Sequence, residues 1–119
     1  MLDSSLEVKI HNILTDYDVP FEEEYEFDDL VASSGKKLRF DFCVFDDEGD
    51  IDFLIEAQGR QHYQSVGKFG GRKGLKRQQY NDRMKVQYCI KNHYNLITIP
   101  YIDENRLSYE YIMRKAGYM

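Results

Sequence analysis

The chain has 119 residues, which is enough for a single domain over residues 1–119 but too few for a catalytic domain plus a separate recognition domain. No segment approaches the roughly 18 apolar residues of a membrane span, and the first residues lack the basic start and apolar run of a signal peptide, so we expect a cytoplasmic protein. The two cysteines, Cys43 and Cys89, fit no metal-ligand spacing and are expected to be free and buried.

Charge is divided very unevenly along the chain. Residues 1–58 contain 17 acidic and 4 basic side chains, a balance of -13, whereas residues 59–119 contain 12 basic and 4 acidic side chains, a balance of +8. The total of -5 would argue against a nucleic-acid partner. A positive half facing phosphate matters more than the total, so DNA stays a plausible partner.

The first quarter of the chain predicts a helix followed by a strand. Ser4 and Glu7 form a capping-box pattern, and apolar residues then recur at helical spacing to Tyr17, so a helix is expected over about 5–17. Residues 21–27 alternate aromatic and glutamate side chains, which predicts a strand with a solvated acidic face. A turn is expected over 28–37.

A hairpin follows. Strict alternation over 38–45 places Phe40 and Phe42 on one face and Asp41 on the other. The acidic turn 46–50 lacks the ligand spacing of a calcium loop and is expected to be solvated. The next strand is apolar over 53–55 and ends on Glu56 and Gln58, which are two residues apart and therefore share a face.

The remaining elements complete an α/β chain. The glycine-rich segment 67–74 has no Gly-Lys-Ser/Thr ending, so it is expected to be a mobile loop and no nucleotide cofactor is expected. A helix is predicted from Leu75 to about Asn92, with Lys85 off a buried stripe of Tyr80, Met84, Tyr88 and Cys89. A short buried strand over 96–99 ends at Pro100, and a last helix is expected over 104–115.

Two acidic side chains in the hairpin suggest a metal site. Burying an unpaired carboxylate costs several kcal/mol, so an apolar strand that ends on Glu56 needs compensation. We expect a divalent cation between Asp41 and Glu56 to provide it. The following segment 59–77 carries no acid, and its six bases are Arg60, Lys68, Arg72, Lys73, Lys76 and Arg77. A metal site made of acidic side chains next to a basic segment suits a phosphodiester substrate, because the basic side chains can bind its phosphates.

The order of elements and four sequence blocks resemble the PD-(D/E)XK superfamily, whose fold is restriction-endonuclease-like. More narrowly, the chain resembles the nuclease domains of phage and mobile-element homing endonucleases and of very-short-patch repair endonucleases. The blocks are Leu38 to Phe42, Ile55 to Tyr63, Asp82 to Cys89 and Leu96 to Tyr101. The motif's usual lysine is Gln58 here, and the proline before its aspartate is Phe40.

The resemblance implies a metal-dependent DNA endonuclease that acts in a host cytoplasm. Asp41, Glu56 and the Ala57 carbonyl would bind Mg²⁺, or Mn²⁺, with retention of water ligands. Gln58 would position the attacking water, and His62 and Lys85 would transfer a proton or stabilise the phosphate; Lys85 stands where some superfamily members carry the displaced basic group. The six bases would hold DNA through its phosphates.

Three alternatives remain open from the sequence. A structure-specific nuclease such as a Holliday-junction resolvase shares this fold and needs no recognition domain. A non-catalytic DNA- or protein-binding module fits the replacement of the lysine by Gln58. A protein-binding inhibitor would use the acidic first half as its surface. Cutting both strands with one site per chain would require a homodimer or two successive nicks.

Overall fold

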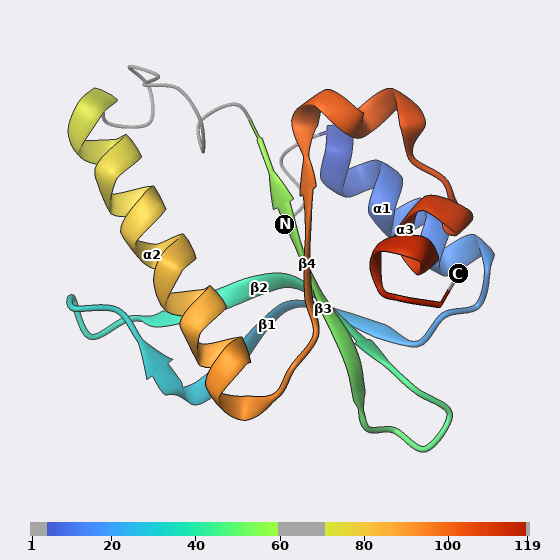
Figure 1. The fold of residues 1–119 in the computed structure, drawn as a ribbon, viewed down its shortest axis with the longest axis horizontal. Helices are drawn as coiled ribbons and strands as arrows, with labels where there is room; N and C mark the ends of the chain where they lie inside the picture. The colour runs from blue at the N-terminus through green and yellow to red at the C-terminus, as the bar shows by residue number, and fades with distance from the viewer. Residues whose placement is uncertain (1–4, 60–70, 119) are drawn as a thin grey trace.

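A four-stranded mixed sheet forms the centre of the protein, described here from a computed structural model of residues 5–59 and 71–118 (Figure 1). The strand order is β1-β2-β3-β4, over Phe21–Val31, Lys37–Phe45, Ile51–Gln58 and Leu96–Pro100. The first three strands pair antiparallel, and β4 pairs parallel with β3. The element order predicted from the sequence is therefore confirmed as an α/β fold.

Helices cover both faces of the sheet. Helix α1 (Ser5–Asp16) and helix α3 (Tyr109–Lys115) lie on one face, and α2 (Gly71–Asn92) lies on the other (Figure 1). The buried side chains separate accordingly into two clusters: Ile10 and Ile112 pack with Ile55 in the first, and Cys89 packs with Leu54 in the second. Alternation along β3 thus serves two cores, as expected for a strand covered on both faces.

Several predicted boundaries are wrong, each for a local reason. Strand β1 continues to Val31 through a register shift after Glu26, so the turn is confined to 32–36. Helix α2 begins at Gly71, so residues 71–74 are helical instead of loop, and Gly74 is buried. Pro100 still pairs with Gln58 at the end of β4. The capping serine Ser4 lies outside the described residues.

The predicted last helix is divided in two. Residues Tyr101–Arg106 form a 3₁₀ helix, η3, and α3 starts only after Ser108, whose backbone is extended. The Ser108 hydroxyl accepts a hydrogen bond of 3.0 Å from the Tyr111 amide, which satisfies one of the free N–H groups of the first turn. A serine at this position therefore starts a new helix.

Replacing Ser108 by alanine should lower the free energy of unfolding by about 1 kcal/mol, because the first turn of the short α3 loses its cap. Urea unfolding followed by circular dichroism measures this change. Ser33→Ala, in the exposed β1–β2 turn, is the matched control and should change stability by less than about 0.5 kcal/mol. An equal effect of both variants would show that the cap does not stabilise α3.

Both cysteines are free and buried, as predicted. Burial raises the pKa of Cys43 to about 12 and that of Cys89 to about 11. A thiol reacts as the thiolate, so neither cysteine is poised for nucleophilic or redox chemistry at neutral pH. Among the described residues, no helix is both long and apolar enough to cross a membrane.

Candidate functional site

Asp41 and Glu56 meet where strands β2 and β3 separate. The paired register begins at Phe42 opposite Ile55, so the next position along would set Asp41 opposite Glu56. The strands exchange side-chain bonds there: the Asp41 amide donates to Glu56 Oε2 at 3.1 Å, and the Ala57 amide donates to Asp41 Oδ2 at 2.7 Å. Each carboxylate is therefore held by the backbone of the opposite strand.

The regular alternation of side chains between the two faces of β2 is interrupted at Asp41. Phe40 packs in the α2 cluster, whereas Phe42 packs in the α1 cluster, although strict alternation predicts one face for both. The two phenylalanines stand on either side of Asp41, where the carboxylate bonds replace the regular ladder. The prediction of a single apolar face was therefore wrong, while the placement of Asp41 beside Glu56 was correct.

Lys85 reaches the pair from helix α2. Its Nζ donates to Glu56 Oε1 at 2.6 Å, and the two side chains are only 11% and 6% exposed. The predicted position of Lys85 off the buried stripe is therefore wrong. Tyr80, which was assigned to that stripe, is 43% exposed instead.

The buried ion pair changes the argument for a cation. Sequence reasoning assigned the compensation of Glu56 to a metal ion, but in this structure the Lys85 ammonium provides it. Within the described ranges 5–59 and 71–118, no basic side chain forms an ion pair with Asp41. Burial first, and then the neighbouring Glu56 carboxylate, raise the pKa of Asp41 to about 7, against the opposing effects of the Ala57 amide and Lys85. Asp41 is therefore only partly ionised at neutral pH, and a bound cation would favour its charged form.

A small cleft adjoins the pair on the α2 side. Its volume is about 10 Å³, and Glu56, Gln58, Asp82, Lys85 and Thr98 contribute to its lining. Glu56 and Gln58 share this cleft, as their spacing predicts. Ala57 points to the opposite core and is 8% exposed. A space of this size holds one water-sized group, and the Lys85 ammonium shares its wall with the oxygen atoms of Glu56, Asp82, Gln58 and Thr98.

Asp82 is a site residue that the sequence analysis did not assign. Helix α2 contains seven basic side chains and one acid, Asp82, which lies one turn before Lys85 and faces the cleft. The signal was present in the sequence, because residues three apart on a helix share a face. Asp82 is therefore the second carboxylate in the wall of the cleft, beside Glu56 and the Lys85 ammonium.

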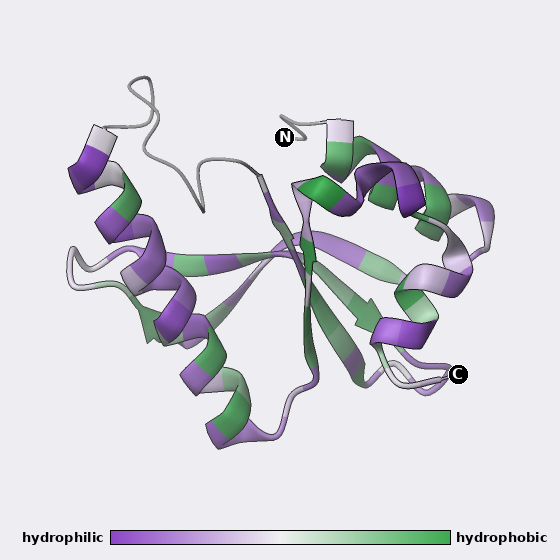
Figure 2. Cartoon of the chain, turned by 45° about the horizontal axis from the view of Figure 1, so that its top comes forward, coloured by the Kyte–Doolittle hydropathy of each residue, from purple (hydrophilic) through white to green (hydrophobic). Residues whose placement is uncertain are grey.

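The predicted DNA-binding residues are divided between two regions. Arg60, Lys68 and the catalytic candidate His62 lie outside the described residues. Arg72, Lys73, Lys76 and Arg77 are exposed on the first half of α2, which is mainly hydrophilic over its length (Figure 2). Arg83 and Lys91 are also exposed on this helix, so its solvent side carries six bases and no exposed acid.

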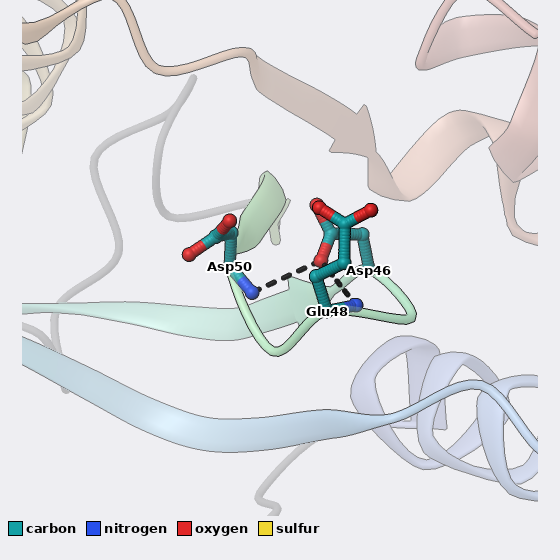
Figure 3. Close-up of side chains that lie close together, drawn as sticks. All are labelled: Asp46, Glu48 and Asp50. Atoms are coloured by element: carbon teal, nitrogen blue, oxygen red, sulfur yellow. Dashed lines mark hydrogen bonds between the residues drawn. The ribbon is translucent and has the colours of Figure 1, made fainter.

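A second acidic cluster lies in the hairpin turn. The carboxylates of Asp46, Glu48 and Asp50 have ligand atoms within 4.8 Å of one another (Figure 3). Asp46 Oδ1 accepts the amides of Glu48 and Asp50 at 2.9 and 3.0 Å, so this carboxylate serves to close the turn. Glu48 and Asp50 are exposed, which agrees with the predicted solvated loop.

The titration of Asp41 predicts how stability depends on pH when no metal is present. Its pKa rises from 3.8 to about 7 on folding, so the folded state binds the proton more tightly. Stability from this group is complete below about pH 4 and is lost as pH rises to about 7, by roughly 2 to 4 kcal/mol. Urea unfolding in EDTA measures the loss, and Asp41→Asn should remove it. An unchanged pH profile in that variant would contradict the assignment.

Comparisons with known proteins give relatives without a described activity. The chain is 29% identical over 90 residues to Uncharacterized protein 307L of Invertebrate iridescent virus 6, covering 74% of this chain and 46% of that protein. It is 47% identical over 70 residues to Uncharacterized protein 094L of Frog virus 3 (isolate Goorha), covering 57% and 43%. The chain thus spans less than half the length of these curated relatives. No family model and no solved structure matches it.

Proposed function

We propose that this chain is a Mg²⁺-dependent DNA endonuclease domain of the PD-(D/E)XK type, with a restriction-endonuclease-like core. The observation that carries the proposal is the meeting of Asp41 and Glu56 on adjacent strands, with Lys85 bonded to Glu56 from the next helix. We place its action in the cytoplasm of an infected cell, which is compatible with the viral origin of the two relatives.

Asp41, Glu56 and the Ala57 carbonyl are the residues that would hold Mg²⁺ or Mn²⁺. The ion would lower the pKa of a bound water and neutralise charge on the scissile phosphate. Both Glu56 oxygens already accept one hydrogen bond each, from Lys85 and from the Asp41 amide, and a carboxylate oxygen has a second lone pair. The existing bonds therefore orient Glu56 without using up its ligand capacity.

The remaining site residues would orient the substrate. Gln58 cannot carry charge, so its role is to position a water or a phosphate oxygen. Lys85 would supply the positive charge that the motif's lysine normally brings, since its ammonium already lies at the same carboxylate. His62 stays a candidate for proton transfer. The basic side of α2 would bind phosphates without reading sequence.

Cleavage by the unmodified protein tests the proposal directly. Supercoiled plasmid, linear duplex and four-way junctions should be incubated with protein in Mg²⁺, Mn²⁺, Ca²⁺ and EDTA. We expect nicked or linear products with Mg²⁺ or Mn²⁺ and none with EDTA. A strong preference for the junction would identify a resolvase. Isothermal titration of metal into protein without DNA measures binding of the ion separately, and cleavage in EDTA would overturn the mechanism.

A non-catalytic module is the second candidate function. The observation that favours it is the ion pair of Glu56 with Lys85, which compensates the buried acid without a metal. Such a module would bind DNA or a protein and cut nothing in any divalent metal. Salt-sensitive DNA binding with no product in the assay above would support this function over the nuclease.

Removing charge from α2 should weaken DNA binding and its salt dependence together. For Lys76→Gln/Arg77→Gln we expect about tenfold weaker binding and a salt slope lower by about 2, because each phosphate contact releases roughly one counterion. Fluorescence anisotropy at several salt concentrations in Ca²⁺ measures both quantities. Lys36→Gln/Arg106→Gln removes the same charge from exposed positions elsewhere. If this control pair has the same effect, α2 is not the DNA surface.

A further inference from the structure

A groove opens at the end of the sheet that is far from the candidate catalytic site. Two adjoining cavities of about 760 and 360 Å³ share Asp18, Phe45, Asp46 and Asp47 in their walls, and together we call them the acidic groove. The groove lies between the turn after α1 and the β2–β3 hairpin. Figure 1 shows that hairpin at the opposite end of β3 from its last residues.

The charge of the groove has one sign. Four aspartates line it, namely Asp18, Asp46, Asp47 and Asp52, and none of the described lining residues is Lys, Arg or His. Asp46 is used by the turn and Asp52 accepts the Tyr118 hydroxyl at 2.6 Å. Within the described part of the chain, Asp18 and Asp47 have no cationic side chain beside them. Walls with low dielectric and one sign of charge attract ligands of the opposite sign.

Aromatic rings also line the groove. Tyr17 and Tyr109 stack with ring centroids 4.3 Å apart and planes within 6° of parallel, and Tyr17 and Tyr118 are 54% and 55% exposed. The faces of tyrosine rings attract Lys and especially Arg side chains, which also pack their carbon stems on the ring. The groove therefore offers aromatic surface and carboxylates to the same ligand.

We propose that the acidic groove binds an arginine- or lysine-rich peptide segment of a partner protein. A single small cation would fill only a small part of cavities of about 760 and 360 Å³, whereas several side chains of a peptide would fill them. Asp18 and Asp47 line both cavities and Asp52 lines the smaller one, so a basic side chain would find a carboxylate in each cavity. The surface is independent of the proposed catalytic site and does not rely on it.

Peptide binding by the full chain tests this inference. The probes are a fluorescein-labelled peptide with several arginines and its counterpart with citrulline, which has the same shape without charge. In EDTA, fluorescence anisotropy should show binding of the arginine peptide that weakens with salt, and no binding of the citrulline peptide. Equal binding of both peptides would overturn the proposal, because the groove would then select for apolar surface alone.

Variants locate the binding surface. Asp18→Asn/Asp47→Asn should weaken the arginine peptide about tenfold, equivalent to two exposed charge pairs; Asn tolerates the positive φ of 54° at Asp18. Glu22→Gln/Glu110→Gln makes the same change in net charge at exposed positions outside the groove and should have an effect of at most about twofold. Equal losses in both pairs would indicate nonspecific attraction and overturn the proposal.

Amide chemical shifts provide a readout that does not depend on variants. Addition of the arginine peptide should shift the amides of residues 17–20 and 46–52, with no change at Asp41, Glu56 or Lys85. The same amides shifting with Ca²⁺ but not with peptide would show an ion site instead of a peptide groove, and shifts confined to other regions would also exclude the groove.

Discussion

Asp41→Asn should reduce DNA cleavage by about a thousandfold or more, equivalent to about 4 kcal/mol of transition-state stabilisation. The carboxylate is one of two acids that would hold the ion, and an amide is a much weaker ligand for a hard cation. Asparagine keeps an oxygen that can accept the Ala57 amide, now bonded to Asp41 Oδ2 at 2.7 Å. The fold should therefore survive, which an alanine would not guarantee.

Initial rates of plasmid nicking in Mg²⁺, measured with protein in excess, give the size of this effect. DNA affinity in Ca²⁺ should stay within about twofold of the unmodified protein, because Asp41 is not part of the basic side of α2. Glu48→Gln is the matched control, since it neutralises an acid of the hairpin cluster and should leave the rate unchanged. Undiminished cleavage by Asp41→Asn would remove the proposed mechanism.

Lys85→Ala should lower the free energy of unfolding by about 3 to 5 kcal/mol in EDTA. The reason is that Glu56, with its side chain 6% exposed, would lose its cationic partner while it stays buried. Lys91→Ala removes an exposed lysine from the same helix and should cost less than about 0.5 kcal/mol. If Lys85→Ala were no more destabilising than this control, water would have to reach Glu56 freely.

The same variant distinguishes a metal site from a purely structural ion pair. A divalent cation that binds only the folded state stabilises it by about 2.7 kcal/mol at a hundred times its dissociation constant. If Asp41 and Glu56 hold an ion, Mg²⁺ or Mn²⁺ should stabilise Lys85→Ala more than the unmodified protein, because the ion replaces the missing ammonium. Absence of stabilisation in both proteins would support the non-catalytic module, and equal stabilisation would show that the ion binds away from Glu56 and Lys85.

The sequence predicted which residues meet at the candidate site better than it predicted the packing of the strands around them. The spacing of Glu56 and Gln58 placed them in one cleft, because strand side chains alternate strictly on β3. The same rule failed on β2, where the exchanged bonds between Asp41, Glu56 and the Ala57 amide interrupt the ladder. That interruption depends on the neighbouring strand, so periodicity within 38–45 could not show it.

The position of Lys85 was misjudged for a similar reason. The buried face of α2 was predicted from its apolar residues alone, which includes the exposed Tyr80 and leaves out the buried Lys85. Lys85 is buried because its partner is 29 positions earlier in the chain, on β3. A helix cap is easier to predict from sequence than a distant ion pair, because the Ser108 hydroxyl bonds to an amide only three residues away. The break between η3 and α3 was still missed, because the apolar pattern continues over 104–115.

The exchanged side-chain bonds between β2 and β3 give Asp41 and Glu56 a structural role that is separate from catalysis. Each acid accepts an amide of the opposite strand, so a replacement without an oxygen acceptor leaves that amide without its partner whether or not any reaction takes place. A descendant that no longer cuts anything would still be under selection to keep an acceptor at both positions. Their presence in a related protein would therefore be evidence for the shared architecture, and catalytic competence has to be judged from residues that the fold does not need.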